Sequence, residues 1–131
     1  MPGKSTFLEN AILNYIKGTA FPAAPAKVYV GLFNGDPTDS GAGGTEVTTT
    51  VRAAGRVEAA FGAVANRTIS NTNIVDFGNS GGTTNITHFA LFSAQAGGNL
   101  LYTAPLTGGT QTINTTNPVS FPVGSVSVTE D

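Results

Sequence analysis

The chain has 131 residues, a formal net charge of −2 and no cysteine, and only 11% of its residues are Asp, Glu, Lys or Arg. A soluble domain usually devotes about a quarter of its positions to those four types. The length fits a single domain over residues 1–131, and the lack of cysteine excludes a disulfide framework and a thiolate zinc site. Because no apolar run approaches the roughly 18 residues of a membrane helix, and the basic residues form no stripe, we expect neither a membrane nor a nucleic acid as partner.

The only helical periodicity lies near the N-terminus. Thr6 and Glu9 have the spacing of a capping box, and Gly18 stands where a helix can end in the left-handed conformation. We therefore predict a helix over residues 6–17. Core packing is the commoner role of such a stripe, and docking on another subunit is the alternative. One face of this helix is apolar and consists of Leu8, Ala11, Ile12, Tyr15 and Ile16.

The rest of the chain has the short alternating runs of strands, separated by Gly and Pro. Residues 21–26 form a Pro-rich connector, and residues 47–67 are predicted as irregular strand. Pro118 and Pro122 place the last strand at an edge or a bulge. The pattern predicts a mainly β fold: an antiparallel β-sandwich or small jelly-roll-like barrel over residues 27–129, with one N-terminal α-helix. The predicted regular strands are 27–33, 74–77, 85–93, 100–104, 110–114 and 119–129.

No Asp, Glu, Lys or Arg occurs between Phe77 and Thr129. Exposed surface normally needs charge to stay soluble and monomeric, so this half of the chain is expected to be covered by further copies of the protein or by a neighbouring assembly. We predict a homo-oligomer, in which a Lys at a covered Thr would weaken assembly. The candidate subunit contacts are Leu8, Ile12, Tyr15 and Ile16 on the helix and Thr110 and Thr112 on a strand. The segment Lys4–Gly18 is expected to serve anchoring more than the fold of the sandwich.

The segment from Phe77 to Thr129 also lacks most of the side chains that act as general acids, general bases or metal ligands. His88 is the only histidine, and its nearest candidates for a triad, Asp76 and Ser93, do not lie in a nucleophile turn. Asp36 and Asp39 lie in a Gly-rich loop without the spacing of a calcium site, so turn formation explains them better. We expect no catalytic residue, no cofactor and no metal site, and a loop over residues 34–44 that is flexible or contacts a partner.

Five segments carry a resemblance to a known family: FLENAILN (7–14), VYVGLF (28–33), ITHFALF (86–92), GGNLLY (97–102) and FPVGSVSVT (121–129). They resemble a family of short virion proteins of tailed bacteriophages that is commonly labelled tail-fibre-like. The resemblance covers most of the chain, departs mainly between Thr48 and Arg67, and brings no catalytic residue with it. It implies a virion structural protein that is assembled in the host bacterial cytoplasm and contacts other virion proteins, either major capsid or tail proteins.

Three roles follow from this resemblance and from the predicted fold. A fibre needs length, repeats or a coiled coil, which this sequence lacks, so a capsid decoration (cement) protein that stabilises the particle through inter-subunit contacts is favoured. A tail-associated structural protein, either a fibre or an adaptor, is the alternative. A host glycan-binding sandwich that uses Tyr15, Tyr29 and Tyr102 is the third role, and the absence of Trp disfavours it.

Overall fold

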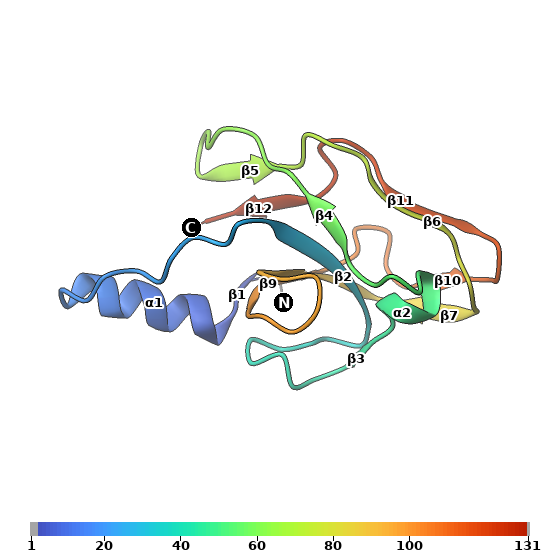
Figure 1. The fold of residues 1–131 in the computed structure, drawn as a ribbon, viewed down its shortest axis with the longest axis horizontal. Helices are drawn as coiled ribbons and strands as arrows, with labels where there is room; N and C mark the ends of the chain where they lie inside the picture. The colour runs from blue at the N-terminus through green and yellow to red at the C-terminus, as the bar shows by residue number, and fades with distance from the viewer. Residues whose placement is uncertain (1–2, 131) are drawn as a thin grey trace.

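A six-stranded antiparallel sheet forms the centre of the protein in this computed structural model, which describes residues 3–130 (Figure 1). Its order is β1-β9-β8-β2, and both β3 and β4 pair with the remaining edge of β2. The central pair places Tyr29 opposite Phe92 and Phe33 opposite His88. The strands are β1 (Gly3–Lys4), β2 (Val28–Asn34), β3 (Thr45–Glu46), β4 (Val57–Ala59), β8 (His88–Phe92) and β9 (Leu100–Pro105).

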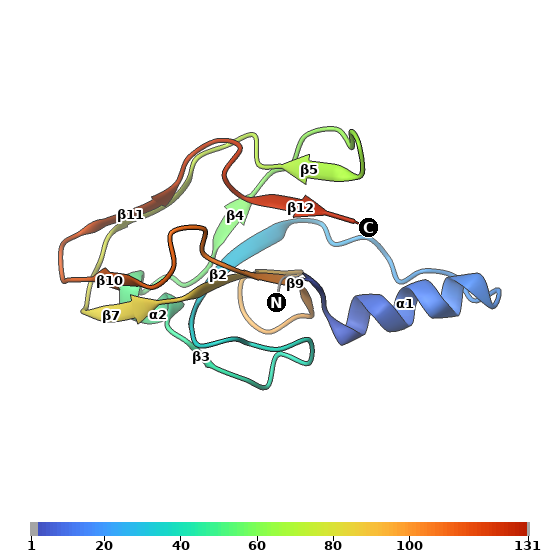
Figure 2. The same cartoon turned by 180° about the vertical axis from the view of Figure 1, so that it is seen from behind.

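A long, bent two-stranded ribbon forms a second layer (Figures 1 and 2). β5 (Thr68–Ser70) pairs with β12 (Ser127–Thr129), and β6 (Val75–Asn79) pairs with β11 (Pro118–Phe121). Just after β4, Phe61 bridges to Asn71, which connects the ribbon to the sheet. At the opposite edge, Lys4 of β1 forms a 2.8 Å ion pair with Glu130 after β12. Within residues 3–130 the result is a mainly β, antiparallel, sandwich-like fold that does not close into a barrel.

The space between the layers contains the main hydrophobic core. Val30, Leu32, Val75 and Val126 are completely buried there. Burying one such aliphatic side chain stabilises a protein by about 1.5–3 kcal/mol, so this cluster is the largest source of stability in the fold. The core also contains Phe77, Ile86, Phe89, Leu91, Tyr102, Ala104 and Val119.

The predicted strand over residues 85–93 is broken at Thr87 into β7 (Thr84–Ile86) and β8. Alternation places Ile86 on the face opposite Phe89, yet the structure buries both in the main core. The cause is that Thr87 leaves the regular ladder. Its N–H donates to Phe33 O at 2.9 Å, and its Oγ1 accepts from Gly35 N–H at 2.7 Å. β7 then pairs with β10 (Gln111–Ile113) as a separate ladder.

Residues 47–67 differ from the irregular strand that the sequence predicts. They contain the one-turn helix α2 (Thr48–Val51), the strand β4 and turns. The helix forms because Leu32 N–H donates to Thr48 Oγ1 at 2.9 Å and Leu32 O accepts from Val47 N–H at 2.8 Å. These two bonds satisfy Leu32 of β2 at the point along its edge where pairing with β3 has ended and pairing with β4 has not begun.

The predicted strand over residues 119–129 is also interrupted, as Pro118 and Pro122 indicated. The register shifts between Val119 and Ser120, and residues 122–126 loop out. The buried Asn71 holds this loop. Its side chain accepts from Val126 N–H at 2.9 Å and donates to Pro122 O at 3.0 Å. An asparagine that satisfies several backbone groups at once fixes the bend of the ribbon over the sheet.

Candidate interaction surfaces

The helix α1 (Thr6–Ile16) projects beyond the body of the protein, and residues 17–27 return beside it (Figures 1 and 2). Its N-cap is Ser5, whose Oγ accepts from Leu8 N–H at 3.2 Å, so the capping box predicted at Thr6 is wrong. The reason is that Ser5 N–H donates to Leu101 O, which extends the pairing of β1 and makes Ser5 the last extended residue. At the other end Gly18 has φ of 99° and terminates the helix as expected. None of the helices in residues 3–130 is long and apolar enough to span a bilayer.

The helix face that the periodicity selects is only partly covered. Ala11 is buried, Leu8 and Ile12 are half-buried, and Tyr15 and Ile16 are 62% and 74% exposed. The periodicity missed three further exposed apolar side chains, Phe7 and Leu13 on the helix and Phe21 on the connector. The Phe21 ring lies 5.1 Å from the Tyr15 ring. We call the projecting helix α1 together with the returning residues 17–27 the arm, and we call Leu13, Tyr15, Ile16 and Phe21 the arm tip.

The base of this arm belongs to the body of the protein. Gly3 and Lys4 pair with Thr103 and Tyr102 of β9, and Ser5 is 1% exposed. The expectation that the whole segment from Lys4 to Gly18 is peripheral to the fold is therefore wrong for residues 4 and 5. The projecting part begins at Thr6.

The opposite end of the molecule has neutral polar side chains. β7 and β10 lie there, far from α1 (Figure 1). Thr110 and Thr112, the two candidate contacts on this half, are both exposed, and Thr112 pairs with Asn85 of β7. Neither strand, nor the turns that adjoin them over residues 79–83, 106–110 and 114–117, contains a charged residue. We call this region the neutral end.

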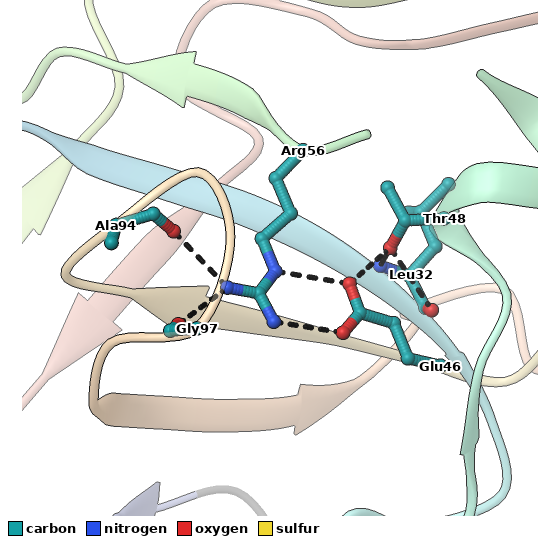
Figure 3. A network of polar contacts seen from close by, with 6 residues as sticks. All are labelled: Leu32, Glu46, Thr48, Arg56, Ala94 and Gly97. Atoms are coloured by element: carbon teal, nitrogen blue, oxygen red, sulfur yellow. Dashed lines mark hydrogen bonds and ion pairs between the residues drawn. The ribbon is translucent and has the colours of Figure 1, made fainter. Parts of the chain in front are cut away.

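An ion pair between Arg56 and Glu46 connects three parts of the body (Figure 3). Arg56 Nε and Nη2 donate to the two carboxylate oxygens of Glu46 at 3.0 and 2.8 Å. Its Nη1 donates to the carbonyls of Ala94 and Gly97, in the turn between β8 and β9, at 3.1 and 2.9 Å. The guanidinium carbon lies 3.4 Å from the centre of the Phe92 ring. All three guanidinium nitrogens and one face of the group are thus used in holding the β8–β9 turn against β3 and β4.

The carboxylate of Glu46 is kept ionised by its neighbours. Partial burial acts to raise the pKa of Glu46, but hydrogen bonds from Arg56 and Thr48 outweigh it and hold the pKa below the ordinary glutamate value. The Thr48 hydroxyl donates to Glu46 Oε2 at 2.6 Å and accepts from Leu32 N–H. The network therefore extends from the ion pair to the backbone of the central strand.

A groove of about 490 Å³ opens beside this network. Apart from the paired Glu46 and Arg56, its walls are mainly small side chains and backbone, including Ala53, Gly55 and Ala96. The sequence pattern does not indicate this ion pair, because both residues lie outside the regular periodic segments. Arg56 is 8% exposed, and this burial of a charge is the signal that only the structure provides.

The three residues considered as a possible catalytic triad each form a separate, local hydrogen bond. His88 Nδ1 lies 2.8 Å from Thr87 Oγ1, Asp76 accepts from Gly78 N–H, and Ser93 Oγ accepts from Asn99 N–H. None of the hydrogen bonds among residues 3–130 joins these three groups to one another. No group of three or more His, Cys, Asp or Glu side chains in that range is placed to hold a metal ion.

Most residues of the loop over 34–44, which the sequence predicts to be flexible or to contact a partner, are exposed, and a few hydrogen bonds tie the loop to its own domain. Partner contact by this loop stays a prediction. Asp36 accepts from Thr38 N–H at 2.8 Å, and this bond lowers the pKa of Asp36. Gly43 N–H donates to Pro37 O at 2.8 Å, and Asp39 O accepts from Thr6 N–H at the start of α1. Asp36 thus forms the turn that its sequence context indicated, and the loop supports the base of the arm.

A comparison with protein families gives a match over residues 3–129 to the family described as podophage GP4 fiber I protein gp80. None of the curated proteins matches the chain significantly. The family match extends across residues 48–67, where the resemblance noted from the sequence departs. It confirms that resemblance: the chain belongs to this family of podophage fibre proteins and is a structural component of a phage virion.

Proposed function

We propose that the protein is an attachment subunit of the podophage virion, which docks on other virion proteins through the arm tip and performs no catalysis. The observation that carries this proposal is the exposure of large apolar side chains on a projecting element. Leu13, Tyr15 and Ile16 are each more than 60% exposed. Several large apolar side chains exposed on one projecting element are typical of an interaction site, because their contact with water is unfavourable until a partner covers them.

The structural contacts of the ionisable groups support a role without catalysis. Arg56 and Glu46 are paired with each other, Asp36 forms a turn, and Lys27 pairs with Glu58 at 3.2 Å. A general acid or base needs a side chain that is available to a substrate. The host-glycan alternative loses support as well, because Tyr102, one of its three proposed tyrosines, is buried in the main core.

The description of the family as a fiber protein favours a place in a fibre of the virion. We therefore propose a fibre-associated subunit first. A capsid decoration protein is the second candidate, favoured by the compact two-layer body and the single projecting arm, which suit clamping of neighbouring capsid subunits. Antibody-labelled particles viewed by negative-stain electron microscopy distinguish the two, since label at the tail supports the first and label over the capsid supports the second.

The docking role of the arm is tested by complementing a phage that lacks this gene product with Ile16→Asp. We expect folded protein that is lost from purified particles, because the carboxylate would be buried unpaired at the contact. Val64→Asp is the matched control, because Val64 is 75% exposed and Ile16 is 74% exposed, but Val64 lies outside the arm. Equal incorporation of the two variants would refute the proposal.

A further inference from the structure

A hollow of about 290 Å³ opens between β10 and β11 at the neutral end of the protein. Its floor is formed by Leu32, Ile86 and Val119, which are almost completely buried. Leu106, Ile113 and Phe121 form its half-buried walls. The hollow therefore reaches from the surface to the main core.

The two strands that flank the hollow are incompletely paired. Within residues 3–130, β10 pairs only with β7 and β11 pairs only with β6, although a short turn connects β10 to β11. They separate because each joins a different layer of the sandwich. The rim contributes Gly108, Gln111 and Ser120, and no charged side chain lines the opening. A site with apolar walls, a neutral rim and room for large side chains suits an uncharged apolar guest.

We propose that the arm tip of a second copy of this protein fills the hollow. The guest and the site match in chemistry, since the tip offers Ile16, Leu13 and an aromatic pair to an apolar cavity. They also match in charge. Neither the four side chains of the arm tip nor the residues that line the hollow carry a charge, so this contact would bury no unpaired charge.

The positions of the two features permit this contact to repeat. α1 lies at one end of the long axis, and β7 and β10 lie at the other, in both views of the molecule (Figures 1 and 2). An arm at one end and its acceptor at the other form a head-to-tail interface, which leaves a free arm and a free acceptor at the ends of every pair. Such an interface gives either a ring or an open row of subunits. A row would let a compact chain without repeats or heptads contribute to a fibre.

This inference rests on the proposed docking role of the arm and names the partner. It is tested by cysteine trapping, because the natural chain has no cysteine. Phage particles are assembled with the double variant Ile16→Cys/Ser120→Cys, oxidised, and analysed on a non-reducing gel. We expect a covalent ladder of dimers, trimers and larger species, since a disulfide forms only when the two Cα atoms lie within about 7 Å. The matched control Ile16→Cys/Ser127→Cys places its second cysteine on an exposed serine of β12 that does not line the hollow, and it should give no ladder.

Each of the other possible results also decides whether the head-to-tail contact and the docking role of the arm are correct. A dimer formed by Ser120→Cys alone would show that neutral ends pair with each other, and it would overturn the inference. Absence of a ladder from the double variant, with Ile16→Asp still lost from particles, would mean that the arm binds a different virion protein. The head-to-tail contact would then be wrong while the proposed function stands. If Ile16→Asp is also incorporated normally, both ideas fail.

Discussion

The two faces of the main sheet are covered by different chemistry. On one face Leu32 and its neighbours pack against the ribbon in an apolar core. On the other face Phe33, Ala90 and Phe92 form a small cluster, which the Arg56–Glu46 pair covers. Gly31 shows how closely the charges approach that face, since a Cβ there would lie 3.1 Å from Glu46 Oε2.

This difference shows that one sheet can be stabilised by buried apolar surface on one side and by an oriented ion pair on the other. The stability that the apolar face contributes depends on how well its side chains fill the space between the layers, and this contribution changes little with pH. The polar face depends on both members of a pair, because removing one leaves the other desolvated without compensation. Substitutions on the two faces should therefore differ in size and in their response to pH.

The largest effect is expected on the apolar face. Leu32→Ala removes a completely buried side chain from beneath the ribbon. The free energy of unfolding should fall by about 3 kcal/mol from lost burial and the cavity that remains. Urea unfolding followed by circular dichroism measures this fall, and a loss that is the same at every pH is part of the prediction. A loss below about 1 kcal/mol would mean that the ribbon collapses onto the sheet and fills the space.

On the polar face, Arg56→Met should lower the free energy of unfolding by about 2 kcal/mol, less than for a fully buried pair because Glu46 remains partly solvated. Adding Glu46→Gln to this variant should recover part of the loss, since the unpaired carboxylate is then gone. Arg67→Met is the control, because Arg67 is exposed. If the double variant is less stable than Arg56→Met alone, the Glu46 carboxylate has another stabilising role.

The strands and the helix could be predicted because their signals are local. Apolar spacing gave α1 within one residue at its C-terminal end, and alternation gave β2 and β9 closely. The choice of N-cap could not be predicted, because Ser5 and Thr6 are both good caps and the decision depends on Leu101 O, far away in the chain. The break at Thr87 likewise depends on Phe33 O.

The Arg56 network could not be predicted for a related reason. Two of the groups that bind Arg56 are the backbone carbonyls of Ala94 and Gly97. Carbonyl groups are present at every residue, so a sequence gives no sign of which ones converge on a guanidinium group. The arm tip was found in part because Tyr15 and Ile16 obey the periodicity. Leu13 and Phe21 do not: Leu13 lies three residues before Ile16 on the helix, and the path of the connector brings Phe21 beside Tyr15.

The pH dependence of the unfolding free energy should distinguish the polar face from the apolar face. The pKa of Glu46 is lower in the folded protein than in the unfolded chain, so the pair stabilises the protein above the unfolded pKa and loses this effect as pH falls through the folded pKa. The unfolding free energy of the natural protein should therefore decrease between about pH 5 and about pH 3. Asp36 contributes in the same direction, because its pKa is also lowered. The part due to Glu46 is the difference from Arg56→Met/Glu46→Gln, and equal slopes would show that the ion pair does not cause the response.

The smallest effect on stability is expected outside both faces, at the arm tip. Ile16→Ser should change the free energy of unfolding by no more than about 0.5 kcal/mol, because the side chain is 74% exposed and contributes to neither core cluster. Ala11→Ser is the comparison within the same helix, since Ala11 is buried and should cost more. Urea unfolding measures both variants. If Ile16→Ser destabilises the isolated protein as much as Ala11→Ser, the tip is part of the fold. A negligible loss instead means that the apolar side chain of Ile16 contributes free energy only when another protein covers it.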